Sequence, residues 1–258
     1  MIRRLSLALA FFATAAWAQS SELRTVHVFV ALADNQHQGI VPVAPILGNG
    51  DDPQHNLYWG SAYGVKSFFE RSPDWKIVSC MSRPKAEILE RCVFKNRLKD
   101  VYLIADAYRG LEIKQAILEF LEAAAGDGAE KWSPQGADGP KLPIAGSANL
   151  VAYVGHDGLM DFQLSRFPQR KNAARRDVII LACASKQFFG DAVQASGAYP
   201  LIWTTGLMAP EAYTLKSALD GWIAGENNEQ VRDRAAGAYD KYQKCGFRAA
   251  HRLLTSGW

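Results

Sequence analysis

The chain has 258 residues, of which 48% are hydrophobic, and its formal net charge is +3. A balance this close to neutral gives no reason to expect nucleic acid or an anionic membrane as a partner. The length and the apolar content are typical of one folded domain with a large core.

The N-terminus has the three parts of a cleavable secretion signal. Arg3 and Arg4 precede an apolar run over residues 5–16, which is too short to span a bilayer, and Ala16-Trp17-Ala18 is a cleavage pattern. We therefore predict a signal peptide over 1–18 and a single exported α/β domain over 19–258, either periplasmic or extracellular. No later stretch is long and apolar enough to span, so the mature chain is expected to lack an integral membrane segment.

Apolar runs and helical patterns alternate through the first half of the chain. A β-rich run is followed by a loop over 35–56 and by a helical pattern over 57–70. Apolar positions at steps of three and four then predict a helix over 113–124, which Gly126 ends. The strands expected in this half cover residues 25–32, 75–79 and 101–105.

The second half begins with a Gly/Pro-rich loop over 126–148 and continues with further short apolar strands. Those strands are expected over 150–154, 178–182 and 200–204. A helical stripe over 212–223 and an amphipathic helix over 228–245 follow them. This alternation predicts an α/β fold with a mostly parallel central sheet and helices on both faces.

Four cysteines remain after the signal, and export favours disulfides. Cys80 and Cys92 are close in sequence, and neither ends a long apolar strand, so we expect them to pair. Cys245 follows the last long helix and either stays free or pairs with Cys183. The second pairing would exclude a nucleophilic role for Cys183.

Two of the apolar strands lead to residues whose side chains can take part in catalysis. The run over 150–154 leads through Gly155 to His156, and the run over 178–182 leads directly to Cys183. Ligands of open α/β sheets bind beyond the carboxyl ends of the strands. If the two strands are neighbours, a thiol and its base meet at one sheet edge.

Further features around these residues fit thiol chemistry. A helix capped by Ser185 and starting just after Cys183 would stabilise a thiolate through its N-terminus. Backbone N–H groups around Gly158 and Cys183 are candidate oxyanion donors. His156 would accept the thiol proton and later return it to a leaving amine.

The two motifs resemble the caspase-like fold of cysteine peptidases, which includes caspases, legumains, gingipains and clostripains. The matching segments are Tyr153-Val154-Gly155-His156-Asp157-Gly158 and Ile180-Leu181-Ala182-Cys183-Ala184-Ser185. The resemblance implies a caspase-like three-layer sandwich, with His156 as the general base, Cys183 as the nucleophile and no cofactor.

Two further segments are similar to legumain-like peptidases. Ile202-Trp203-Thr204-Thr205-Gly206, followed by Glu211-Ala212-Tyr213, looks like the strand and loop after the catalytic Cys, which makes Thr204 and Thr205 candidate substrate-binding residues. Asn35, after the first strand, matches an Asn that orients the catalytic His in legumains.

Three functions are therefore considered. The first is an exported cysteine endopeptidase that cleaves peptide or protein substrates through a thioester at Cys183. The second is a non-catalytic binding or scaffolding module of the same fold, since Asp157 separates His156 from Gly158 and the Q-A-C caspase signature is absent. The third is a metal-dependent hydrolase that uses a polar loop cluster, namely His37, Asp51, Asp52 and His55.

Overall fold

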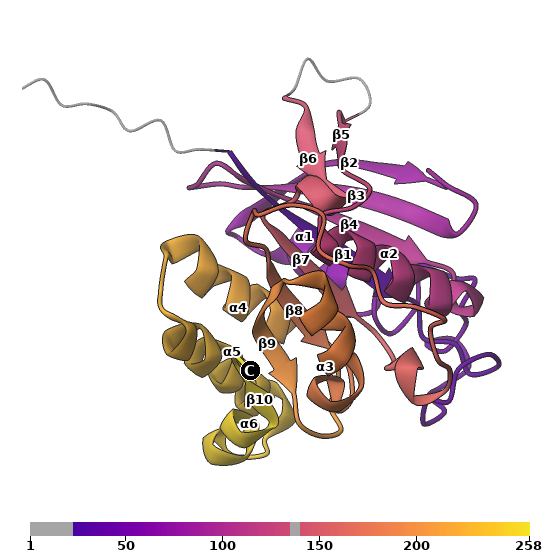
Figure 1. The fold of residues 1–258 in the computed structure, drawn as a ribbon. Coiled ribbons are helices and arrows are strands. Elements are labelled where there is room, and N and C mark those ends of the chain that lie inside the picture. Colours follow the sequence, from indigo (N-terminus) through magenta and orange to yellow (C-terminus); the bar gives the residue numbers. More distant parts are fainter. Residues whose placement is uncertain (1–22, 135–139) are drawn as a thin grey trace, which may run out of the picture.

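The computed structural model describes residues 23–134 and 140–258, so the expected signal peptide over 1–18 lies outside the described residues. An eight-stranded sheet runs through the molecule in the order β10-β9-β8-β7-β1-β4-β3-β2 (Figure 1). The strands are β1 (Arg24–Ala31), β2 (Trp75–Ser82), β3 (Ile88–Asn96), β4 (Val101–Tyr108), β7 (Leu150–Val154), β8 (Asp177–Leu181), β9 (Tyr199–Thr204) and β10 (Leu254–Thr255).

The five central strands β4, β1, β7, β8 and β9 are parallel, and β3, β2 and β10 add antiparallel strands at the two sides. All residues of β7 and all but the first of β8 are buried, which explains their continuously apolar sequences. The predicted mostly parallel α/β sheet is therefore confirmed.

Helices cover both faces of the sheet and complete three layers (Figure 1). On one face lie α1 (Val65–Arg71), α4 (Ala212–Ala224) and α5 (Asn228–Gln243). On the other face lie α2 (Ile113–Ala125) and α3 (Ser185–Ser196). The short α6 (Phe247–Leu253) leads into β10, and β5 (Glu130–Trp132) pairs with β6 (Leu142–Ile144) in a separate hairpin.

Local sequence signals set the ends of the long helices. Helix α2 ends at Gly126, whose φ of 85° lies in the left-handed region that glycine adopts without a steric penalty. Helix α5 begins with a capping box, in which the side chains of Asn227 and Gln230 each accept a hydrogen bond from the other's backbone N–H.

Several elements differ from the sequence predictions: β5 and β6 lie in the segment expected as a loop over 126–148, and α6 and β10 were not predicted. The helix expected over 57–70 begins only at Val65, and the residues before it form turns. Strand β3 was not predicted, because it contains charged residues that normally face solvent. Glu90 and Arg91 are buried here, and Arg91 makes two hydrogen bonds of 2.6 Å to the Asp106 carboxylate on β4.

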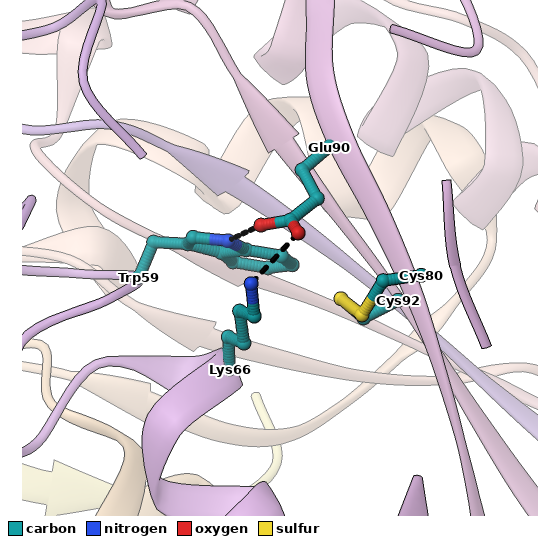
Figure 2. Close-up of a disulfide and its surroundings, with 5 residues drawn as sticks. All are labelled: Trp59, Lys66, Cys80, Glu90 and Cys92. Carbon is teal, nitrogen blue, oxygen red and sulfur yellow. Dashed lines mark hydrogen bonds and ion pairs between the residues drawn. A yellow bond between two sulfur atoms is a disulfide. The ribbon is translucent and has the colours of Figure 1, made fainter. Parts of the chain in front are cut away.

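The predicted disulfide between Cys80 and Cys92 is present and joins directly opposed residues of β2 and β3. Figure 2 shows the buried carboxylate of Glu90 beside it, on the same strand as Cys92. Glu90 accepts hydrogen bonds from the Trp59 indole N–H and the Lys66 ammonium group, each at 2.7 Å. These contacts tie the loop before α1, and α1 itself, to the sheet.

Among the described residues, no helix combines the length and the apolar character that crossing a bilayer requires.

Candidate active site

The register of β7 and β8 brings His156 and Cys183 to one edge of the sheet. Val154 is paired with Leu181, and the Gly155 N–H donates a hydrogen bond of 3.2 Å to the Leu181 carbonyl. His156 and Cys183 each follow this last pair by two residues. The two strands therefore deliver the imidazole and the thiol to equivalent positions, as the sequence predicted.

Cys183 lies in a tight turn between β8 and α3. The next residue, Ala184, has φ 47° and ψ 32°, a left-handed conformation that costs a non-glycine residue about 1–2 kcal/mol. The Ala184 N–H donates to the Gly206 carbonyl at 2.8 Å, which holds this conformation in place. Strained residues of this kind concentrate at functional sites.

The helix after the thiol begins differently from the prediction. Ala184, not Ser185, is the N-terminal cap of α3, and no side chain caps this end. The Ser185 hydroxyl instead donates back to the Ile180 carbonyl of β8 at 3.1 Å. The expected capping role of Ser185 was therefore wrong, although the first turn of α3 still lies directly after Cys183.

His156 is 8% exposed and is fixed by a carboxylate. Its Nε2 lies 2.6 Å from Oδ2 of Asp161, which also accepts a hydrogen bond of 3.0 Å from the Gly39 N–H. The contact with Asp161 places the proton of the neutral imidazole on Nε2. Nδ1 then carries the lone pair, and it makes no hydrogen bond within the described part of the chain.

His156 and Cys183 both line a cavity of about 270 Å³. The Cys183 thiol is free, and Sγ lies 3.4 Å from the Met208 nitrogen and 3.7 Å from its oxygen. Most of the other lining residues are apolar: Ile40, Val41, Val43, Leu57, Met160, Leu207, Met208, Ala209 and Pro210. Such a mixture of apolar walls and a few polar groups is typical of small-ligand sites.

Three ionisable groups near the cavity have shifted pKa values. Burial, with the added negative charges of Cys183 and Glu211, raises the pKa of Tyr58 well above its usual range. Burial likewise raises the pKa of Glu211. Burial also raises the pKa of Asp157, directly after His156, to about 7.

None of the four residues predicted to contact substrate or the oxyanion lines the cavity, namely Asn35, Gly158, Thr204 and Thr205. Asn35 uses its amide to clamp its own loop, donating to the Val43 carbonyl at 2.9 Å and accepting from the Val43 N–H at 3.1 Å. The Gly158 N–H donates to the His156 carbonyl at 3.1 Å. By contrast, the Cys183 N–H makes no hydrogen bond within residues 23–134 and 140–258.

Thr204 and Thr205 have different surroundings. The buried Thr204 hydroxyl donates to the Ala182 carbonyl and accepts a hydrogen bond of 3.1 Å from the Ser185 N–H, so it braces the turn that carries Cys183. The Thr205 hydroxyl donates to the Arg252 carbonyl at 2.9 Å. Neither threonine lines the cavity.

The loop residues considered as metal ligands form separate pairs. His37 lies 2.8 Å from Asp34, and His55 lies 2.7 Å from Asp52. Asp51 pairs with Arg109 at 2.6 Å. Within the described residues, these side chains do not form a group of three potential ligands.

The fourth cysteine, Cys245, is free and exposed, so the alternative pairing with Cys183 is not formed. Asp157 and Asp161 both flank His156 in the sequence, where either could tune the imidazole or face solvent, and the structure gives the contact to Asp161. Nothing in the sequence singled out Tyr58, since it reaches the cavity from a turn far from both motifs.

No protein family, curated protein or solved structure matches the chain.

Proposed function

We propose that the protein is an exported cysteine endopeptidase in which Cys183 is the nucleophile and His156 the general base. One observation carries the proposal: the free Cys183 thiol lines the same cavity as His156, whose orientation is fixed by Asp161. The resemblance of both strand-end motifs to caspase-like peptidases supports peptide hydrolysis, and the N-terminal signal pattern supports export.

The geometry supports a mechanism in two stages. His156 Nδ1 accepts the thiol proton, and the Cys183 sulfur attacks the peptide carbonyl. The oxyanion accepts a hydrogen bond from the Cys183 N–H, which has no other partner in the described chain. His156 then protonates the leaving amine as the C–N bond breaks, which leaves a thioester. Water, deprotonated by His156, cleaves the thioester and restores the thiol.

Asp161 acts as a positioning residue in this scheme. When His156 accepts the thiol proton, the imidazolium gains a charge-assisted hydrogen bond to the carboxylate 2.6 Å away. This contact would stabilise the thiolate–imidazolium pair, and it leaves Nδ1 as the ring nitrogen that can accept the thiol proton.

One observation favours the alternative, a non-catalytic binding or scaffolding module. The Cys183 sulfur lies within hydrogen-bond distance of the Met208 backbone, and within the described residues it makes no hydrogen bond to His156. A thiol held in this way for structural reasons would have ordinary reactivity. The two proposals therefore predict different pH ranges for the ionisation of the Cys183 thiol.

The deciding experiment is the rate of Cys183 alkylation by iodoacetamide as a function of pH, measured by peptide mass spectrometry. Cys245 is free and exposed, so it serves as an internal reference thiol. An ordinary thiol ionises near pH 8.5. If Cys183 and His156 form a catalytic pair, iodoacetamide should label Cys183 rapidly well below that pH. His156→Ala should slow the alkylation of Cys183 at least about tenfold, because it removes the imidazolium whose positive charge stabilises the thiolate.

His55→Ala is the matched control, because His55 is exposed and pairs with Asp52 away from the cavity. It should leave the Cys183 profile unchanged. A Cys183 profile that follows Cys245 and is unaffected by His156→Ala would reject the peptidase proposal and leave the binding module.

A further inference from the structure

The cavity beside Cys183 contains two polar side chains that the proposed hydrolysis does not use. Tyr58 lines the cavity and is 6% exposed, and its hydroxyl makes no hydrogen bond within the described residues. The hydroxyl is therefore available to hydrogen-bond to a group that enters the cavity.

Glu211 is the second polar group and the one carboxylate in the lining. Its Oε2 accepts hydrogen bonds from the Tyr213 hydroxyl at 2.8 Å and from the Gln243 amide at 3.2 Å. These contacts fix the carboxylate, whereas Oε1 has no partner within the described part of the chain. Glu211 therefore retains an acceptor for a bound group.

Tyr58 and Glu211 line the same cavity as the thiol. Burial, together with the negative charges of Cys183 and Glu211, raises the pKa of Tyr58. The phenol thus stays protonated at neutral pH and remains available for hydrogen bonding. Together the two side chains form a polar subsite in the cavity that also contains the reacting sulfur.

The rest of the cavity lining is mostly apolar, with Leu57, Met208 and Pro210 among its residues. The complementary side chain has an aliphatic stem and a head that donates hydrogen bonds. A positive head offsets the partly buried carboxylate, whereas an acidic head would place like charges together in a poorly solvated site.

We propose that the cavity selects lysine or arginine as the substrate residue whose carbonyl carbon Cys183 attacks, with Glu211 and Tyr58 holding the cationic head. The assignment to that residue follows from the cavity itself, because one cavity of about 270 Å³ contains both the sulfur and the polar subsite. This inference rests on the proposed peptidase function.

The test uses peptidyl acyloxymethyl ketones that differ only in the residue bearing the electrophile: lysine, arginine, norleucine, asparagine or aspartate. In each reaction a bond forms between the Cys183 sulfur and the methylene carbon as the carboxylate leaves. Mass spectrometry gives the rate at Cys183, and each rate is divided by that for iodoacetamide in the same preparation. The ratio corrects for thiol reactivity and for the folded fraction.

The lysine probe should react roughly 10- to 100-fold faster than the norleucine probe, whose side chain has the same four carbons but no ammonium group; this is the range expected for a hydrogen bond between charged groups. Glu211→Gln should reduce this preference by about tenfold, and Tyr58→Phe should reduce it less, since it removes no charge. Glu70→Gln is the matched control, because Glu70 is exposed on α1 outside the cavity, and it should leave the preference unchanged.

Two results would overturn the inference while leaving the peptidase proposal intact. One is a preference for aspartate, asparagine or norleucine by a Cys183 whose iodoacetamide reaction depends on His156. The other is a lysine preference that Glu211→Gln does not change. Ordinary thiol behaviour towards iodoacetamide would instead reject the peptidase proposal, and this inference with it.

Discussion

His156 Nε2 lies 2.6 Å from Asp161 Oδ2, and the same oxygen accepts a hydrogen bond from the Gly39 N–H at 3.0 Å. Asp161 therefore joins the loop after β7 to the loop after β1. The resemblance to legumains implied that Asn35, in the second of these loops, would orient the imidazole. In the structure the direct partner of the imidazole is Asp161, and Asn35 holds its own loop together.

Replacing Asp161 with Asn tests this contact. The imidazolium loses a charged acceptor, so Cys183 alkylation at pH 6.5 should slow roughly tenfold and its pH profile should shift upward, since a hydrogen bond to a charged group contributes about 1.5–3 kcal/mol. Asp191→Asn, at an exposed position on α3, should change neither the rate nor the profile. A slower rate with an unshifted profile would show that Asp161 only supports the loop.

Thr204 and Thr205 are adjacent, yet their substitutions should differ. Thr204→Val leaves the buried Ser185 N–H and Ala182 carbonyl without their hydroxyl partner, so the free energy of unfolding should fall by about 1–3 kcal/mol. Thr205→Val removes an exposed hydroxyl and should change it by less than about 0.5 kcal/mol. Urea denaturation gives the free energy of unfolding of each variant. Equal losses in the two variants would contradict the bracing role of Thr204.

The disulfide between Cys80 and Cys92 should contribute to stability independently of the candidate site. It closes a loop over a separation of 12 residues, for which the entropic model gives about 3 kcal/mol. Reduction should lower Tm by roughly 5–10 °C, measured by scanning calorimetry with and without a phosphine reductant. A variant with both residues changed to Ala should have the lower Tm throughout, and a reductant effect on that variant would point to another cause.

The sequence predicted the central strands well because their burial on both faces requires continuous apolar runs. The bounds of β7 over residues 150–154 agree with the prediction. Strand β3 was missed because its stability depends on partners that no local pattern reveals. Glu90 is buried against Trp59 and Lys66, and Arg91 against Asp106, all supplied by other elements.

The candidate site was predictable to a similar extent. His156 and Cys183 stand at strand ends, and parallel register alone brings such positions together. Tyr58 and Glu211 reach the cavity from a turn before α1 and from the start of α4. Their approach depends on how the helices cover the sheet, which periodicity does not specify.

We expect the protonation of Asp157 to make the stability of the fold depend on pH. It is fully buried, and its Oδ1 accepts a hydrogen bond of 3.0 Å from the Leu159 N–H, whereas Oδ2 has no partner in the described structure. Burial raises its pKa to about 7, and the nearby charge of Asp161 adds to the shift. In the unfolded chain the pKa returns to about 4.

Between about pH 4 and pH 7, the folded state therefore retains a proton at Asp157 that the unfolded state releases. Stability from this group is complete below pH 4, falls as the pH rises through this window, and changes no further above it. Asp157→Asn keeps the Oδ1 acceptor but cannot ionise. The loss of unfolding free energy between pH 5 and pH 8 should thus be smaller in the variant by roughly 2–4 kcal/mol.

Urea denaturation at the two pH values gives this difference directly, and the comparison does not depend on the absolute stability of the variant. Asp191→Asn serves as the control, because an exposed carboxylate on α3 should leave the pH dependence of the wild type unchanged. If Asp157→Asn and the wild type lost the same free energy between pH 5 and pH 8, Asp157 would have to be ionised in the folded protein. Its Oδ2 would then need a partner, such as a bound water or cation, since an isolated buried carboxylate is too costly to keep.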